Sequence, residues 1–317
     1  MQAPQTPTNV TYIPNSSQWV LKNAAEEAYL IQAAWPLTWK SQTCDDKDIP
    51  VFYVLDGNAY FFSAVEAARR CSMVSTSANA IIVGISYPHS EFVFHSRRNF
   101  DLTPPSATYT PPRDADGKEH PADHGGATAF LDFLINTVRT FIFSDAFPQL
   151  QIGKEVLIGH SYGGLCTLHA LFTSVTPFQV FTAISPSIWW NDKFILTEQE
   201  EFLKKDIPVS SGQIAPKATV LFAYGTYEQD PCRRSDWGEG EYQKHLELAR
   251  ERSMGKNTEV MAASLKGSGR FENVELRVYQ QEDHLSVAVC GINWAVSRIL
   301  DPERLPTPSK SHATVES

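Results

Sequence analysis

Two hydrophobic patterns alternate along most of the chain. Short, continuous apolar runs at residues 50–57 and 80–86 predict strands that are buried on both faces. Between such runs, apolar residues recur at intervals of three and four, as in residues 59–70 and 128–143, which predicts helices. Strands that alternate with helices imply an α/β fold with a mostly parallel sheet of about eight strands and helices on both faces.

The same reading extends to both ends of the pattern. Residues 18–22 and 28–35 alternate apolar and polar positions, which predicts an antiparallel hairpin at one edge of the sheet. The later strands are expected at residues 156–158, 181–185, 218–224 and 274–279. The later helices are expected at residues 197–205, 239–255 and 285–300.

The domain organisation follows from where this alternation stops and resumes. Residues 101–126 are rich in Pro, Thr, Asp and Gly, and the strand and helix pattern resumes after them. We therefore expect one domain at residues 16–301 with an insertion loop near 101–126. Residues 1–15 are expected to form an N-terminal extension, and the Pro/Ser/Thr-rich residues 302–317 a flexible tail.

Composition narrows the range of functions. The 317 residues carry a net charge of −9 without a block of Lys or Arg, which argues against nucleic acid or an anionic membrane as a partner. No apolar run is long enough to span a membrane. The five cysteines are widely spaced, so neither a disulfide framework nor a zinc site is indicated. Because the N-terminus lacks the basic and apolar regions of a secretory signal, we expect a cytoplasmic protein.

One motif suggests chemistry. Gly159, Ser161 and Gly163 form GxSxG, directly after the apolar strand at residues 156–158 and before apolar residues at helical spacing. In a nucleophile elbow, a strained turn between a strand and a helix exposes the serine hydroxyl, and small neighbours let the backbone pass closely. The alternative is a serine on an ordinary turn, but the flanking strand and helix favour the elbow.

A serine nucleophile needs a base, and the base an orienting carboxylate. In α/β-hydrolases these follow the serine in the order acid, then histidine. Glu228 lies just after the predicted strand at residues 218–224, and Asp230 is the alternative acid. His284 lies after the last predicted strand, where the base belongs.

Two backbone N–H groups are expected to stabilise the developing oxyanion. One belongs to the residue after the nucleophile, Tyr162, and the other to the loop after the first parallel strand, at Gly57 or Asn58. The loss of one such donor costs about 3 kcal/mol of barrier in comparable sites.

Six motifs in order resemble the esterase D-like family of α/β-hydrolases, and within it the siderophore esterases of the IroE type and their fungal relatives that open esters such as triacetylfusarinine C. The motifs are Tyr53-Val-Leu-Asp-Gly-Asn58, Arg97-Arg-Asn-Phe-Asp-Leu-Thr-Pro104, Gly125-Gly with Phe130-Leu-Asp-Phe-Leu134, Gly159-His-Ser-Tyr-Gly-Gly164, Ser185-Pro-Ser-Ile-Trp-Trp-Asn191 and Asp283-His284. The resemblance implies an α/β-hydrolase fold, Ser161 as nucleophile, His284 as base, and Gly57 and Tyr162 as oxyanion donors. Some members work with a Ser–His dyad, so the acid is not carried over.

The resemblance also implies substrate-binding residues. Trp189 and Trp190 match an aromatic wall, although neighbouring residues point in opposite directions and only one of them need line the site. Arg97 and Arg98 match an arginine-bearing loop that faces the substrate; the alternative is an internal pair with Asp101.

The resemblance implies a cytoplasmic serine esterase that hydrolyses a small-molecule ester, a ferric siderophore, through an acyl-enzyme. No metal and no organic cofactor are expected, because any iron arrives with the substrate. Two alternatives within enzymology are an acyltransferase and a general carboxylesterase or S-formylglutathione hydrolase-like enzyme. An alternative of another class is a non-catalytic siderophore-binding protein.

Overall fold

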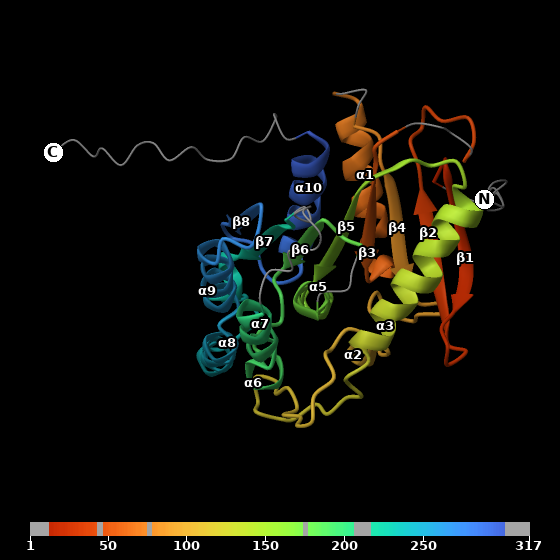
Figure 1. Cartoon of the computed structure of the whole chain (residues 1–317). Helices are drawn as coiled ribbons and strands as arrows, with labels where there is room; N and C mark the ends of the chain where they lie inside the picture. Colours follow the sequence, from red (N-terminus) through yellow and green to blue (C-terminus); the bar gives the residue numbers. More distant parts are fainter. Residues whose placement is uncertain (1–12, 43–46, 75–77, 174–176, 206–216, 302–317) are drawn as a thin grey trace, which may run out of the picture.

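One twisted sheet of eight strands runs through the molecule, with helices packed on both faces (Figure 1). This is a computed structural model, and it describes residues 13–42, 47–74, 78–173, 177–205 and 217–301. Most of the expected N-terminal extension and the whole expected tail lie outside the described residues. The division of the chain into an extension, a single domain and a tail stays a prediction.

The sheet is mostly parallel, as predicted. Its order is β1-β2-β4-β3-β5-β6-β7-β8, in which β1 pairs antiparallel with β2 and β2 with β4, while every other neighbouring pair is parallel. The antiparallel edge expected from the first hairpin is therefore confirmed. The strands are β1 (Ser16–Lys22), β2 (Ala28–Ala34), β3 (Ile49–Leu55), β4 (Ile81–Ser86), β5 (Ile152–His160), β6 (Val180–Ile184), β7 (Thr219–Gly225) and β8 (Asn273–Tyr279).

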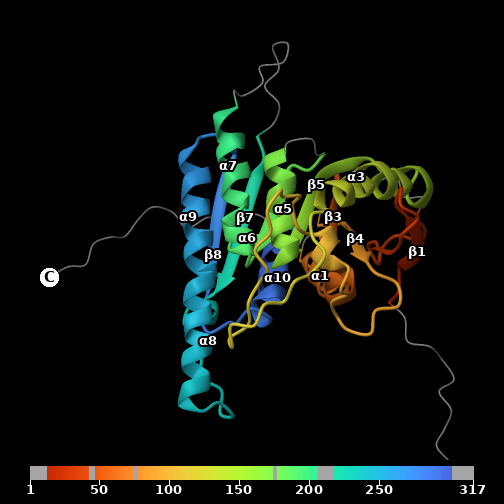
Figure 2. The ribbon, with the colours of Figure 1, turned by 90° about the horizontal axis from the view of Figure 1, so that it is seen from below.

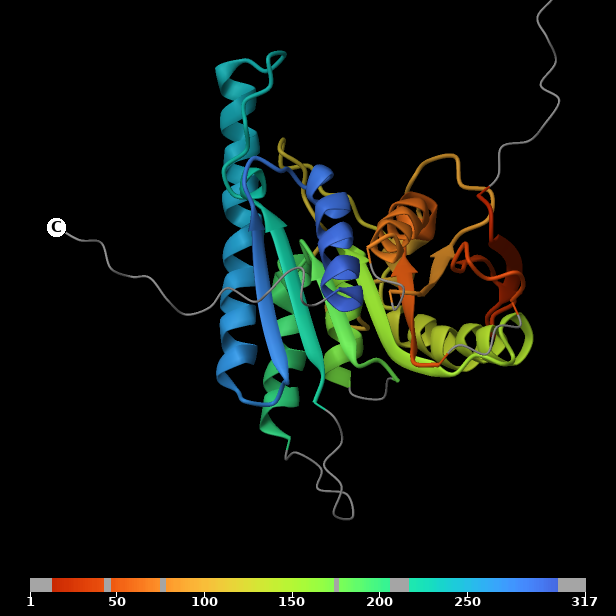
Figure 3. The ribbon, with the colours of Figure 1, turned by 90° about the horizontal axis from the view of Figure 1, so that it is seen from above.

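Helices cover the two faces unequally (Figures 2 and 3). Helices α1 and α10 pack against one face, and α3, α5, α7 and α9 pack against the other. Among the described residues, no helix combines the length and apolar character that crossing a membrane requires. The helices are α1 (Gly57–Ser72), α2 (Arg98–Asp101), α3 (Ala127–Phe133), α4 (Arg139–Phe141), α5 (Tyr162–Thr173), α6 (Trp190–Lys193), α7 (Ile195–Lys204), α8 (Glu239–Arg252), α9 (Met254–Gly267) and α10 (Ser286–Leu300), with π-helical turns at Leu134–Val138 and Ile142–Ala146 and a 3₁₀ turn at Thr226–Glu228.

The helix predicted at residues 239–255 is wrong at its C-terminal end. Helix α8 ends at Arg252, because Ser253 adopts a left-handed backbone with φ of 46°, and α9 begins directly after it. No residue of α8 is buried, and in Figures 2 and 3 this helix projects beyond the strands. In α9 the buried residues Met254, Thr258, Met261 and Leu265 recur at helical spacing, so the sequence held a signal that the prediction missed.

The insertion loop at residues 101–126 passes near α6 on its way from α2 to α3 (Figure 1). Asn191 in α6 holds this loop: its side-chain amide donates to the Thr108 carbonyl at 2.8 Å and accepts from the Thr110 N–H at 2.8 Å. The last residue of the Ser185–Asn191 motif therefore anchors the loop at the carboxyl ends of the parallel strands, where ligands bind in such sheets.

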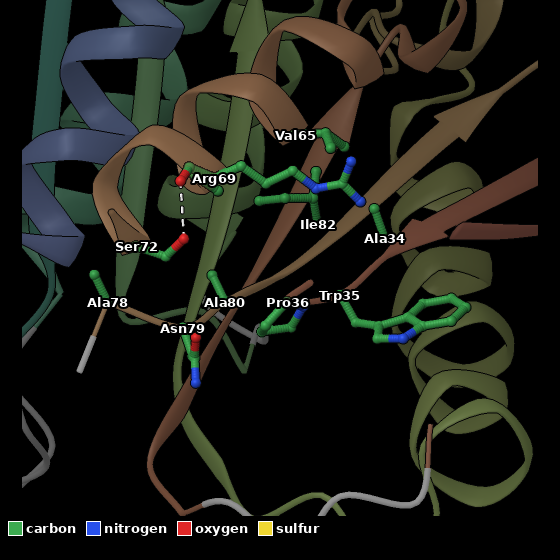
Figure 4. Close-up of a pocket in the computed structure, with 11 residues that line it drawn as sticks. Ala34, Trp35, Pro36, Val65, Arg69, Ser72, Ala78, Asn79, Ala80 and Ile82 are labelled. Carbon is green, nitrogen blue, oxygen red and sulfur yellow. Dashed lines mark hydrogen bonds between the residues drawn. The ribbon is translucent and has the colours of Figure 1, made fainter. Parts of the chain in front are cut away.

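A small pocket lies at the other end of the sheet (Figure 4). Its lining includes Ala80, just before β4, and Ala34, which pairs with Ile82. With a volume of about 10 Å³ it has room for one water molecule at most.

A buried ion pair links β5 to the helical segment that precedes it. The side chain of Glu155 is 4% exposed, and Arg139 donates to it with Nε at 2.8 Å and Nη2 at 2.9 Å. The Tyr53 hydroxyl donates to the same carboxylate at 3.0 Å. Burial, followed by the charge of Glu155, raises the pKa of Tyr53 well above its usual value.

We expect Arg139→Ala to lower the free energy of unfolding by about 2–4 kcal/mol, because it leaves the Glu155 carboxylate buried without a cation. Urea unfolding followed by circular dichroism measures this. The control is Arg234→Ala, which removes an exposed pair with Asp236 and should cost less than about 1 kcal/mol. Equal losses in both variants would contradict the prediction.

Candidate active site

Ser161 lies on the sharp turn between β5 and α5. Its backbone is left-handed, with φ of 59°, which is uncommon for a residue other than glycine. A Cβ atom on Gly159 would lie 2.0 Å from the Gly163 carbonyl oxygen, so only glycine lets strand and helix approach this closely. The strand, turn and helix predicted around GxSxG are therefore all present.

Hydrogen bonds link Ser161 to His284 and His284 to Glu228, the two residues predicted as its base and acid. His284 Nε2 lies 3.0 Å from Ser161 Oγ, and His284 Nδ1 lies 2.5 Å from Glu228 Oε1. Glu228 belongs to the 3₁₀ turn after β7, and His284 lies between β8 and α10. The alternative acid, Asp230, is exposed at the surface. The structure thus brings Ser161, His284 and Glu228 together from three strand ends.

Glu228 is held in one orientation. Its side chain is 1% exposed. Oε2 accepts hydrogen bonds from the Ser185 hydroxyl at 2.6 Å and from the Gly225 N–H at 2.8 Å. These donors leave Oε1 for the imidazole of His284, which selects the tautomer with its proton on Nδ1 and its lone pair towards Ser161.

The loop that carries His284 is fixed on both sides. The Asp283 carboxylate accepts from the Ser286 N–H at 2.8 Å and the Leu285 N–H at 2.9 Å, and the Ser286 backbone bond is the main cause that lowers the pKa of Asp283. A Cβ atom on Gly225 would lie 2.2 Å from the Glu282 carbonyl oxygen. Glycine at the end of β7 thus lets the loop approach the turn that carries the carboxylate.

The expected oxyanion donors all lie at helix N-termini. Gly57 and Asn58 begin α1, and Tyr162 begins α5. N–H groups in the first turn of a helix have no acceptor within that helix and favour negative charge nearby. The Asn58 side chain is tied to Tyr87, donating to its carbonyl at 2.9 Å and accepting from its N–H at 2.7 Å.

Arg98 braces the start of α1. Its Nε and Nη2 atoms each donate to the Asp56 carboxylate at 2.8 Å, a two-pronged pair in which Asp56 is buried. Burial alone would lower the pKa of Arg98, but the charge and hydrogen bonds of Asp56 outweigh it and raise the pKa above its usual value. This pair fixes the residue directly before Gly57.

Arg97 makes the internal pair that the sequence left open as the alternative to substrate binding. Its Nε lies 3.3 Å from Asp101 Oδ2, and its Nη2 donates to the Ala28 carbonyl at 2.8 Å. Neither Arg97 nor Arg98 is among the described residues that line the cleft around Ser161. Their geometry favours a structural role for both arginines.

An open cleft of about 740 Å³ surrounds Ser161. The two predicted tryptophans divide as expected for neighbouring residues: Trp189 lines the cleft, whereas Trp190 is 1% exposed and packs in the core beside Tyr109 and His124. The aromatic wall predicted from the pair is therefore a single tryptophan from this motif. The other cleft residues are Pro112, Arg113, Asp114, His120, Tyr162, Ser187, Tyr227, Glu228, Pro231, Trp237, His245, Leu248, Ala249, Arg252, Met254, Asp283, His284 and Leu285.

Comparison with known proteins assigns the chain to a family. The Esterase family model, described as "Putative esterase", matches residues 35–239. The chain belongs to this esterase family. A "Siderophore enterobactin esterase" from Emericella nidulans is 38% identical over 86% of this chain and 89% of that protein. A "Siderophore triacetylfusarinine C esterase" from Aspergillus fumigatus is 39% identical over 89% of this chain and 91% of that protein.

The fold is shared with solved members of the esterase family. "Siderophore hydrolase EstA from Aspergillus nidulans" superposes with a TM-score of 0.88 at 34% identity, covering 95% of this chain and 99% of that one. The α/β-hydrolase fold implied by the sequence motifs is thereby confirmed. The resemblance to siderophore esterases is confirmed at the level of the family.

Three residues at the site escaped the sequence analysis. Ser185 holds Glu228, and the Ser187 hydroxyl lies 3.3 Å from Ser161 Oγ. Both belong to the Ser185–Asn191 motif, whose position after β6 was the available signal. Arg252, at the end of α8, had no signal, because α8 is an exposed helix rich in charged residues.

His160, next to the serine, is buried against His284. The Tyr60 hydroxyl lies 2.9 Å from its Nδ1, and the rings of His160 and His284 are 4.5 Å apart. Burial, followed by repulsion from a charged His284, lowers the pKa of His160 well below its usual value. The imidazole of His160 is therefore neutral at physiological pH.

This burial should make stability fall in mild acid. Below about pH 6.5 the unfolded chain protonates His160 while the folded chain does not, so the free energy of unfolding decreases as pH falls, by up to about 1.4 kcal/mol per pH unit. We expect a shallower decrease in His160→Gln, measured by urea unfolding between pH 7 and pH 5. His245→Gln, at a half-exposed position, is the control; equal slopes in both variants would refute the assignment.

Proposed function

We propose that this protein is a serine esterase that cleaves ester bonds through an acyl-enzyme, with Ser161 as nucleophile, His284 as general base and acid, and Glu228 as the carboxylate that orients His284. The observation that carries the proposal is the hydrogen-bonded chain of these three side chains at an open cleft, in a chain that belongs to an esterase family.

The reaction follows from the geometry. Ser161 Oγ attacks the ester carbonyl and gives its proton to His284 Nε2. Glu228 stabilises the imidazolium that forms, and His284 then protonates the leaving alcohol. Water enters, gives a proton to His284 Nε2 and attacks the acyl-enzyme; His284 then returns that proton to Ser161 Oγ as the acid leaves, which restores the free enzyme.

The oxyanion formed in each step needs fixed donors. We infer that the N–H group of Tyr162 and an N–H group of Gly57 or Asn58 supply them. The support is their place in the first turns of α5 and α1, where N–H groups lack helical partners. The ion pair of Arg98 with Asp56 positions the N–H group of Gly57 or Asn58.

We propose a siderophore polyester as the substrate. The support is the likeness to relatives named as enterobactin and triacetylfusarinine C esterases, over most of both chains. The cleft combines aromatic side chains from Trp189, Trp237 and Tyr227 with polar ones, which suits a large, oxygen-rich molecule. Iron is the cargo of this substrate, and ester cleavage releases it. A cytoplasmic site of release is the further prediction, tested by fractionation of cells that express a tagged chain.

Replacing the nucleophile should abolish turnover without unfolding the protein. We expect Ser161→Ala to lower kcat by roughly 10⁶-fold. The assay incubates purified protein with ferric triacetylfusarinine C, ferric enterobactin and simple aryl esters, and follows the products by mass spectrometry. Circular dichroism and a fluorophosphonate label check the fold and the reactive serine. Activity near the wild-type level in Ser161→Ala would end the proposal, and preference for aryl esters would end the siderophore assignment.

A second variant distinguishes a triad from a Ser–His dyad. Glu228→Gln keeps the shape of the side chain but removes the charge that stabilises the imidazolium, so we expect kcat to fall by about 10³- to 10⁴-fold with little change in KM. Asp230→Asn, at the exposed acid nearby, is the control and should retain activity. A loss below tenfold in Glu228→Gln would favour a dyad.

A further inference from the structure

Arg252 stands over one wall of the cleft that contains Ser161. Its guanidinium carbon lies 4.5 Å from the centre of the Trp189 ring, and the Trp189 ring centre lies 6.4 Å from that of Tyr162. Because Tyr162 follows Ser161 in the chain, two ring contacts connect the guanidinium to the nucleophile. Arg252 thus faces the same space as the reacting serine, at some distance from it.

Arg252 differs from the other charged side chains that line the outer part of this cleft. Arg113 is paired with Glu119 at 2.9 Å, and Asp114 is paired with His120 at 2.7 Å. Among the residues that the structure describes, no carboxylate forms an ion pair with Arg252. Within the described part of the chain, the Arg252 side chain makes one hydrogen bond, from Nη2 to the Arg113 carbonyl at 2.9 Å.

Partial removal of the Arg252 guanidinium from water disfavours its charged form unless an anion pairs with it. Arg252 is half-buried, and this partial burial lowers its pKa below the usual value, although the charge of the neighbouring Glu251 opposes the shift. A guanidinium has five N–H donors and no acceptor, so most of its hydrogen-bonding capacity here is open to a ligand. The guanidinium carbon lies over the Trp189 ring, at a distance typical of a cation–π contact.

Arg252 also lies on the boundary between two hollows. A second open cavity, of about 510 Å³, adjoins the cleft and shares with it Pro112, Arg113, Trp189, Leu248 and Arg252. A ligand that extends from Ser161 past Trp189 therefore meets the guanidinium before it enters the second cavity. This is where the far end of a long substrate would lie.

We propose that Arg252 binds a carboxylate at the end of the leaving-alcohol part of the substrate, so that the enzyme favours partly opened polyesters. The inference rests on the proposed function. Hydrolysis of one ester in a cyclic polyester of hydroxy acids yields one hydroxyl end and one carboxylate end. In the linear product, the alcohol part of the last ester carries that carboxylate. A cation beyond Trp189 would then retain the product of the first cleavage for the next one.

The test uses matched esters that differ only in this charge. One series consists of butyrate esters of ω-hydroxy acids of increasing chain length, and the other of the corresponding ω-hydroxy amides, which are neutral. Release of butyrate is followed by chromatography with mass detection. We expect wild-type kcat/KM to be roughly tenfold higher for the acid than for the amide at the best chain length, mainly through a lower KM, and to fall towards equality in high salt.

Three variants assign the effect to Arg252. Arg252→Gln should lower the ratio of kcat/KM for the acid to kcat/KM for the amide to about one. Arg252→Lys keeps the charge but not the flat fork, so it should keep part of the preference. Arg250→Gln removes an equal charge from an exposed position on the same helix and should behave as the wild type.

The outcomes separate the two proposals. If the wild type hydrolyses acids and amides equally, or if Arg252→Gln keeps the preference, the role of Arg252 is refuted while the esterase proposal stands. If the wild type hydrolyses neither these esters nor the siderophores, and its serine is not labelled by the fluorophosphonate, the esterase proposal itself fails.

Discussion

The left-handed turn at Ser161 is the constraint on which the site depends. It exists because the backbones of β5 and α5 touch at Gly159 and Gly163. A Cβ atom on Gly159 would lie 2.0 Å from the Gly163 carbonyl oxygen. The turn raises the hydroxyl above the edge of the sheet, where loops from β7 and β8 can reach it. The positions of His284 and Glu228 have meaning only relative to this turn.

The central site could be predicted because its parts are bound to strand ends. Ser161, Glu228 and His284 each follow an apolar run, and parallel strands bring such ends to one edge. The cleft walls were harder to predict. Trp190 lies in the core and Trp189 faces the cleft; the sequence predicted that the two neighbours would point in opposite directions, but not which of them would face the cleft. Arg252 lies on an exposed helix, where no hydrophobic pattern indicates which side faces the site.

Arg97, Arg98 and Arg252 differ in whether a buried carboxylate pairs with them, and this difference separates a structural role from a role in binding a ligand. Arg97 and Arg98 looked like substrate contacts in the sequence, yet each has a buried carboxylate as its partner, Asp101 and Asp56 respectively. The positive charges of Arg97 and Arg98 are therefore compensated within the protein. Arg252 is packed against a tryptophan without such neutralisation, and its charge is therefore directed to the cleft.

The Asn191 side chain has a consequence for how this scaffold diversifies. It fastens the insertion loop to α6 through the backbone groups of Thr108 and Thr110 and through the Ser106 hydroxyl, to which the amide donates at 3.0 Å. Because two of these three bonds go to backbone groups, most residues of the loop can be exchanged while these two bonds persist. New ligand preferences can arise along the rim without disturbing the reactive centre beneath it.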